Sequence, residues 1–173
     1  MNYADIKRVD VANGPGVRVS LFVSGCTHRC EGCFNPETWD FDYGKPFGEG
    51  EVQTILALLD KSHIRGLSLL GGEPFEPQNQ GPVLDLVRRV RESLPRKDIW
   101  CYTGYLFEQL AAGGVGAHSR SLLEMLDVLV DGPFVQEKKN LALAFRGSEN
   151  QRILDVPASL RAGEVRLAEE YMA

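Results

Sequence analysis

The stretch SGCTHRCEGCFN, residues 24–35, contains three of the four cysteines of the chain. Cys26, Cys30 and Cys33 have the spacing C-x3-C-x2-C, and they follow an apolar alternation that predicts a strand at residues 18–23. Thiolates are soft ligands that suit iron-sulfur clusters, and a loop that doubles back after a strand can enclose one. Three ligands on a four-iron cluster leave one iron open, where a substrate can bind. The stretch therefore predicts a 4Fe-4S cluster bound by these three cysteines.

Two other interpretations of the cysteines compete with a cluster. A structural zinc site needs four ligands, usually two C-x2-C pairs, and here His28 or Cys101 would have to complete the set. We expect His28 to be a solvated loop residue and Cys101 to be a small buried hydrophobic residue. A disulfide would require an oxidising compartment. The first ten residues have no apolar core of a secretory signal, so we expect a cytoplasmic protein.

Length and composition indicate an ordinary globular domain. The chain has 173 residues, 43% of them hydrophobic and 25% charged, which is enough to bury a sizeable core. No apolar run approaches the roughly 20 residues that span a bilayer, so we expect no membrane segment. The formal net charge of -5 argues against nucleic-acid binding, which depends on clustered Lys and Arg. If the target is a macromolecule, a protein is the better expectation.

Predicted strands and helices alternate along the chain. We expect strands at residues 18–23, 66–70, 98–102 and 127–130, with further short strands near 141–145 and 152–156. We expect helices at residues 51–61, 106–112 and 119–125, and another that starts at Pro82 and stops at Pro95. Residues 36–50 read as irregular, and residues 157–173 as a terminal helix or a loose tail. This order predicts an α/β fold with parallel strands and outer helices, and six strands are too few for an eight-stranded barrel, so we expect an open, partial barrel.

Each unusual motif directly follows a predicted strand. The cysteines follow the first strand, Gly71-Gly72-Glu73 the second, Thr103-Gly104 the third and Asp131-Gly132 the fourth. Ligands of α/β sheets and barrels collect at the carboxyl ends of the strands, where the connecting loops converge. We therefore expect all four motifs to contribute to a single site.

Six segments, taken in order, resemble one known family. They are NGPGVR (13–18), SGCTHRCEGCFNPETW (24–39), GGEPF (71–75), YTGY (102–105), DGPFV (131–135) and RGSENQR (146–152). Together they resemble the anaerobic ribonucleoside-triphosphate reductase activating proteins, a branch of the radical S-adenosylmethionine enzymes, and the match runs from about the first residue to Val156. Many members of the wider superfamily have an aromatic residue where this chain has Gly32. The activating-protein branch is similar to this chain in having C-x-G-C followed by an aromatic residue and Asn.

The resemblance implies a fold, an activity and partners. It implies a single radical S-adenosylmethionine domain at residues 1–156, a partial parallel β/α barrel, with residues 157–173 as an extension. The implied activity is reductive cleavage of S-adenosylmethionine at a 4Fe-4S cluster, followed by hydrogen abstraction from a glycine of the anaerobic reductase, which leaves a glycyl radical. A low-potential electron donor such as flavodoxin is the implied second partner. No protein acid, base or nucleophile is required, because the cofactors supply the reactivity.

Two other functions remain open from the sequence. One is an activase of a different glycyl-radical enzyme, or a radical enzyme that acts on a small molecule. The other is an iron-sulfur electron-transfer or zinc-binding protein that does not cleave a cofactor.

The same resemblance implies which residues contact S-adenosylmethionine. Gly71 and Gly72 lack side chains, so the backbone can approach the methionine portion, and Glu73 is a candidate acceptor near the positive charge of the cofactor. A Gly-Gly turn with a surface acid is the alternative. The expected contacts are Gly32, Cys33, Phe34, Asn35, Gly71, Gly72, Glu73 and Thr103. Asn35 could instead cap its loop, and Asp131 and Arg146 are weaker candidates.

Overall fold

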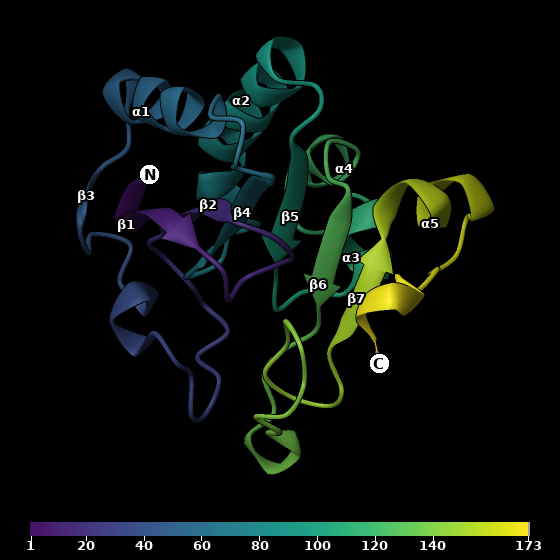
Figure 1. The fold of residues 1–173 in the computed structure, drawn as a ribbon. Coiled ribbons are helices and arrows are strands. Elements are labelled where there is room, and N and C mark those ends of the chain that lie inside the picture. Colours follow the sequence, from purple (N-terminus) through teal and green to yellow (C-terminus); the bar gives the residue numbers. More distant parts are fainter. Residues whose placement is uncertain (173) are drawn as a thin grey trace.

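The fold is built on one seven-stranded sheet with the strand order β3-β1-β2-β4-β5-β6-β7 (Figure 1). The computed structural model describes residues 1–172. The strands are β1 (Asn2–Asp10), β2 (Arg18–Val23), β3 (Lys45–Pro46), β4 (Gly66–Gly71), β5 (Asp98–Tyr102), β6 (Val128–Asp131) and β7 (Arg152–Asp155). The neighbours β2, β4, β5 and β6 are parallel; β1 and β7 flank them antiparallel, and β3 pairs antiparallel with β1. The expected α/β class and the open sheet are confirmed, but the sheet is only partly parallel, because the antiparallel pairs of β1 and β7 flank the four parallel strands.

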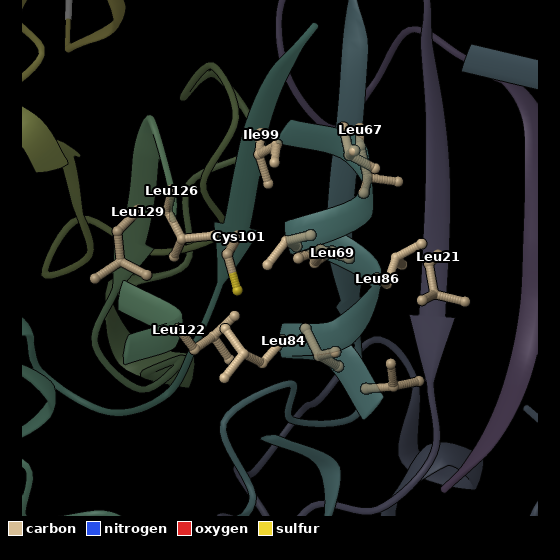
Figure 2. Packing of buried hydrophobic residues seen from close by; sticks show 14 of the residues in the cluster. Leu21, Leu67, Leu69, Leu84, Leu86, Ile99, Cys101, Leu122, Leu126 and Leu129 are labelled. Atoms are coloured by element: carbon tan, nitrogen blue, oxygen red, sulfur yellow. The ribbon is translucent and has the colours of Figure 1, made fainter. Parts of the chain in front are cut away.

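Helices cover one face of this sheet, and we call it the helix-covered face. They are α1 (Glu49–Leu59), α2 (Pro77–Ser93), α3 (Phe107–Ala111) and α4 (Ser119–Leu123). Side chains alternate between the two faces of a strand, so Leu21, Leu69 and Cys101 all point toward these helices. Figure 2 shows the Cys101 sulfur among leucines, and Cys101 is fully buried, as expected of a small hydrophobic residue.

Polar and aromatic side chains lie on the opposite face, and we call it the cavity face. Arg18 is fully buried there; its guanidinium donates to the Ser68 hydroxyl at 2.7 Å and to Asp98 at 2.5 Å, and it lies 5.6 Å from the centre of the Trp100 ring. Trp100 in turn contacts Tyr171 at the end of the described chain, with ring centroids 5.0 Å apart. This face is therefore covered by loops and the C-terminal segment, and its buried charge is compensated by hydrogen bonds.

Two strands were not predicted. β1 carries the exposed residues Lys7, Arg8 and Val9, and only its first two residues pair with β3. Edge strands of this kind carry charge and lack a buried alternation, so their sequence resembles that of a loop. The expected first strand at residues 18–23 is therefore β2.

The strand expected near residues 141–145 is wrong. This segment forms turns: Leu141 is 82% exposed, Asn140 accepts from the Ala142 amide at 2.9 Å, and Phe145 has a φ of 61°. An Asx turn and a left-handed residue both interrupt an extended strand. The alternating apolar residues Leu141, Leu143 and Phe145 are explained by a cavity that all three border, which is described below.

The other predicted elements occur with shifted ends. α2 begins at Pro77, so the prediction that it starts at Pro82 is wrong by more than one turn. After β7, α5 (Val156–Ala162) begins with Asp155 accepting from the Ala158 amide, and the short 3-10 helix η3 (Glu169–Tyr171) follows. Residues 36–50 contain the 3-10 helix η1 (Pro36–Trp39) and β3. None of the helices in residues 1–172 has the length and apolar character to cross a membrane.

Candidate functional site

A cavity of about 510 Å³ opens at the carboxyl ends of the parallel strands. Its size is typical of a site for a small molecule or cofactor. In Figure 1 the segment after β2 and the loop after β6 extend from the same lower edge of the sheet, and both contribute to the walls. The expected site residues that line the cavity are Cys26, Cys30, Cys33, Phe34, Asn35, Gly71, Gly72, Glu73 and Thr103. The structure thus brings the loops after β2, β4 and β5 together as expected.

The cysteine loop is shaped by unusual backbone geometry. Arg29 has a φ of 50° and Gly32 a φ of 77°, and these left-handed residues fold the loop back on itself. The positive φ of Gly32 favours glycine, and a Cβ atom at this position would also displace the side-chain amide of Gln136 in the segment after β6. Gly32 itself does not line the cavity, and its expected role as a cofactor contact stays a prediction.

The three thiols are free, and backbone amides surround them. Burial raises the pKa of Cys26 to about 12, although the backbone amides of His28 and Arg29 oppose this shift. Burial also raises the pKa of Cys30, while the Asn35 amide donates to the Cys33 sulfur at 3.4 Å. Amide donors of this kind stabilise thiolates and tune iron-sulfur centres.

The donor set fits an iron-sulfur cluster. In residues 1–172, no group of three or more His, Cys, Asp or Glu side chains is arranged to hold a single metal ion. A structural zinc ion needs ligands that converge on one point. A cluster spreads its thiolate ligands over separate irons, so three sulfurs around a cavity suit it better than they suit zinc.

Glutamates on the loop after β4 anchor the cysteine loop. Glu76 accepts from the Thr27 amide at 2.8 Å and from the Thr27 hydroxyl at 2.6 Å. His28 Nε2 lies 2.8 Å from Glu73 Oε1, and the ring contacts Tyr105 with centroids 4.4 Å apart. The expectation that His28 is solvated is therefore wrong, because its ring is enclosed between the two loops. Burial alone would lower the pKa of His28, but the hydrogen bond and charge of Glu73 outweigh it and raise the pKa.

Glu73 connects three loops through its carboxylate. It is 1% exposed and accepts from the Thr103 hydroxyl, from the Gly104 amide at 2.7 Å and from the Phe75 amide at 2.9 Å. It was expected to be an acceptor for a cofactor, or else a surface acid. The structure instead shows a buried carboxylate whose hydrogen-bond partners are protein groups, including the Thr103 hydroxyl.

The glycine pair that precedes Glu73 is required by the fold. A Cβ on Gly71 would lie 2.6 Å from backbone atoms of Val23, and one on Gly72 would lie 2.7 Å from the Gly25 carbonyl. The glycines therefore allow the loop after β4 to pass directly over the end of β2. This close approach positions the cysteine loop against the cavity.

The weaker candidates divide into structural and cavity residues. Asp131 is fully buried, accepts from the Phe107 amide at the start of α3 and pairs with Arg152, so it is structural. Arg146 lines the cavity. Phe34 lines it too, is 58% exposed and leans toward Phe134, with ring centroids 5.2 Å apart.

Several cavity residues were missed by the sequence analysis, and Trp39 and Tyr102 are two of them. Trp39 borders the cavity and has the Arg29 guanidinium 5.6 Å from its ring centre. Tyr102 borders it at the end of β5. Both residues lie within the segments that resemble the activating proteins. Tyr102 could have been proposed as a cavity residue because it directly precedes Thr103, which was expected in the site.

Comparisons with known proteins agree with this site. A family model described as a 4Fe-4S single cluster domain matches residues 12–154, which include all three cysteines of the loop. The chain is 44% identical over 153 residues to the anaerobic ribonucleoside-triphosphate reductase-activating protein of Escherichia coli (strain K12), covering 87% of this chain and 96% of that protein. For the proteins of the same name from Vibrio cholerae and Enterobacteria phage T4, the identities are 46% and 43% over 155 residues. These two alignments cover 88% of this chain, and 97% and 93% of the respective relatives.

Proposed function

Because the chain belongs to the family of anaerobic ribonucleoside-triphosphate reductase-activating proteins, we propose that it activates such a reductase by radical S-adenosylmethionine chemistry. The observation that carries the proposal is the meeting of three free thiols, on one loop with the three-cysteine spacing, at a cavity large enough for a cofactor. When bound, the cluster and S-adenosylmethionine supply a one-electron reductive cleavage and a hydrogen abstraction that leaves a glycyl radical on the partner.

The chain's own residues hold and shield the cofactors in this proposal. Cys26, Cys30 and Cys33, which all line the cavity, would hold the cluster through their thiolates. Glu73 and Glu76 keep the cysteine loop in place through His28 and Thr27. The chain supplies no acid, base or nucleophile to the reaction, so its contribution is positioning and the exclusion of water.

S-adenosylmethionine is proposed to contact the residues around the cluster loop. Cys33, Phe34, Asn35, Gly71 and Gly72 all border the cavity. Glu73 and Thr103 also line the cavity and remain proposed contacts, although they are bonded to each other, whereas Gly32 is proposed to contribute through its backbone beside Cys33.

The architecture supports an open, partial β/α barrel of the radical S-adenosylmethionine type. Four parallel strands carry the site, and loops cover the cavity face without closing the sheet. We assign this domain to residues 1–156, with residues 157–173 as an extension. An open side could admit a glycine-containing loop of a large reductase, and a low-potential donor such as flavodoxin would supply the electron. Free thiols and a reduced cluster suit a cytoplasmic location.

The test is anaerobic reconstitution with iron and sulfide, followed by dithionite and S-adenosylmethionine. We expect 5′-deoxyadenosine from the parent and from Cys101→Ala, and none from Cys30→Ala. Adding the reductase should then produce a glycyl-radical signal by electron paramagnetic resonance. A verified, reducible cluster that yields no 5′-deoxyadenosine, with or without the reductase, would overturn the proposal in favour of electron transfer.

A further inference from the structure

Hydrogen-bond donors without a protein partner concentrate at the cavity. In residues 1–172, the buried side-chain polar atoms that lack a hydrogen-bond partner are Trp39 Nε1, Asn79 Oδ1, Tyr102 Oη, Arg146 Nε and Asn150 Oδ1. Trp39, Tyr102 and Arg146 belong to the cavity wall. A buried polar group without a partner costs free energy, so such groups indicate where a ligand or water completes the hydrogen bonding.

Tyr102 is the strongest of these candidates because of its position on the sheet. It is the last residue of β5 and faces away from the helices, since its neighbour Cys101 points into the helix-covered core. In the neighbouring strands, Phe22 pairs with Leu70, and both line the cavity with Tyr102. Leu70 is level with Tyr102, because Leu69 pairs with Cys101. Phe22, Leu70 and Tyr102 therefore form one row across the cavity face, and Tyr102 carries the only hydroxyl in this row.

The charged groups nearest to this hydroxyl are already engaged. Asp10 and Arg18 both influence the pKa of Tyr102. Asp10 accepts from the Ala12 amide, the Asn13 side chain and the Ser20 hydroxyl, and Arg18 donates to Ser68 and Asp98. Burial raises the pKa of Tyr102, so the phenol stays protonated and neutral. It is therefore a hydrogen-bond donor that the surrounding chain leaves unused.

We propose that the Tyr102 hydroxyl is a cofactor-binding group that donates a hydrogen bond to an acceptor oxygen of S-adenosylmethionine. This inference rests on the proposed function and adds a specific residue to it. S-adenosylmethionine presents carboxylate and ribose oxygens as acceptors and is small enough to reach the floor of a cavity of about 510 Å³. A peptide segment of a partner could present a carbonyl with the same chemistry, and the experiment separates the two sources.

The experiment compares Tyr102→Phe with the parent and with Tyr171→Phe. Tyr171 is a matched control, because its hydroxyl accepts from Arg65 at 3.3 Å and lies outside the cavity. Each protein is reconstituted with its cluster, and S-adenosylmethionine binding is measured without reductant and without the reductase. We expect Tyr102→Phe to bind about 3- to 10-fold more weakly, as the loss of one hydrogen bond predicts, and Tyr171→Phe to bind like the parent.

Thermal unfolding without S-adenosylmethionine supplies the second measurement. Removing an unsatisfied buried hydroxyl should leave the melting temperature unchanged or raise it, whereas removing a structural hydrogen bond should lower it. A lower melting temperature with unchanged cofactor affinity would overturn the inference. The inference would also be overturned if Tyr102→Phe bound S-adenosylmethionine like the parent but bound the reductase more weakly. The acceptor of the Tyr102 hydrogen bond would then belong to the partner. If the parent itself does not bind S-adenosylmethionine, the proposed function fails; if only the difference between parent and variant is absent, the inference alone fails.

Discussion

On the helix-covered face of the sheet, Leu21, Leu69 and Leu86 are fully buried among other apolar side chains, whereas on the cavity face Arg18 and Ser20 are fully buried within hydrogen bonds. Apolar contacts are non-directional and tolerate exchange for side chains of similar volume. Hydrogen bonds to buried charges require particular partners at particular distances. The difference shows that the helix-covered face contributes most of the stability of the fold. The cavity face keeps buried polar groups in fixed positions around the cavity, at some cost in stability.

Cys30→Ala tests whether the cavity face alone holds the cluster. We expect Cys30→Ala to lose nearly all bound iron after reconstitution, because two thiolate ligands bind a 4Fe-4S cluster weakly. Cys101→Ala, on the helix-covered face, should keep its iron. Iron and sulfide analysis with visible absorption measures both. Equal iron in the two variants would remove the distinction between the faces.

Leu86→Ala tests the contribution of the helix-covered face to stability. Leu86 is fully buried in the main core, so the substitution should lower the free energy of unfolding by about 2–5 kcal/mol. Denaturant titration of the cluster-free protein measures this change. The iron bound per folded molecule should match the parent, and a selective loss of iron would show that the two faces are coupled.

Glu73→Gln tests the polar network of the cavity face. The substitution removes a charge that three loops share, and we expect a loss of about 1.5–3 kcal/mol in the free energy of unfolding, together with weaker retention of iron. Glu31→Gln is the matched control, because Glu31 lies exposed in the cysteine loop. An equal effect of the two substitutions would argue against a structural role for the network.

Asp10→Asn should have the smallest effect, and its size should depend on pH. Burial alone would raise the pKa of Asp10, but hydrogen bonds from Ser20, Asn13 and the Ala12 amide hold it below the ordinary value. The ionised carboxylate therefore stabilises the folded state above its unfolded pKa of about 4, and this contribution is lost as the pH falls through the lower folded pKa.

Unfolding of the cluster-free parent and variant at several pH values measures this dependence. We expect a difference of about 1 kcal/mol at neutral pH that shrinks below about pH 4, while the effect of Leu86→Ala stays constant. A difference that grows toward acid pH would contradict the sign of the shift.

The helix-covered face and the cysteine motif could be predicted from sequence because their signals are local. The spacing of Val83, Leu86 and Val90 predicted a buried helix stripe, and all three residues are fully buried. Only the start of that helix was wrong, because Pro82 was taken as its first residue although the chain already turns at Pro77.

The remaining features depend on contacts between distant segments. His28 and Glu73 are 45 residues apart, and their hydrogen bond has no signature in either segment. The alternation of Leu141 and Leu143 predicted a strand, but both side chains border the cavity from a turn. β1 escaped prediction because an edge strand with exposed charges carries no apolar period.

The hydrogen bonds that hold the cysteine loop in place have a consequence for a protein that has lost its cluster to oxygen. Thr27 and His28 hold the loop through Glu76 and Glu73, and no cysteine sulfur takes part in these bonds. Because these bonds join groups of the polypeptide, we expect the loop to keep its shape when no cluster is bound. After loss of a damaged cluster and reduction of the thiols, we expect such a loop to take up a new cluster without refolding, provided that iron and sulfide are supplied.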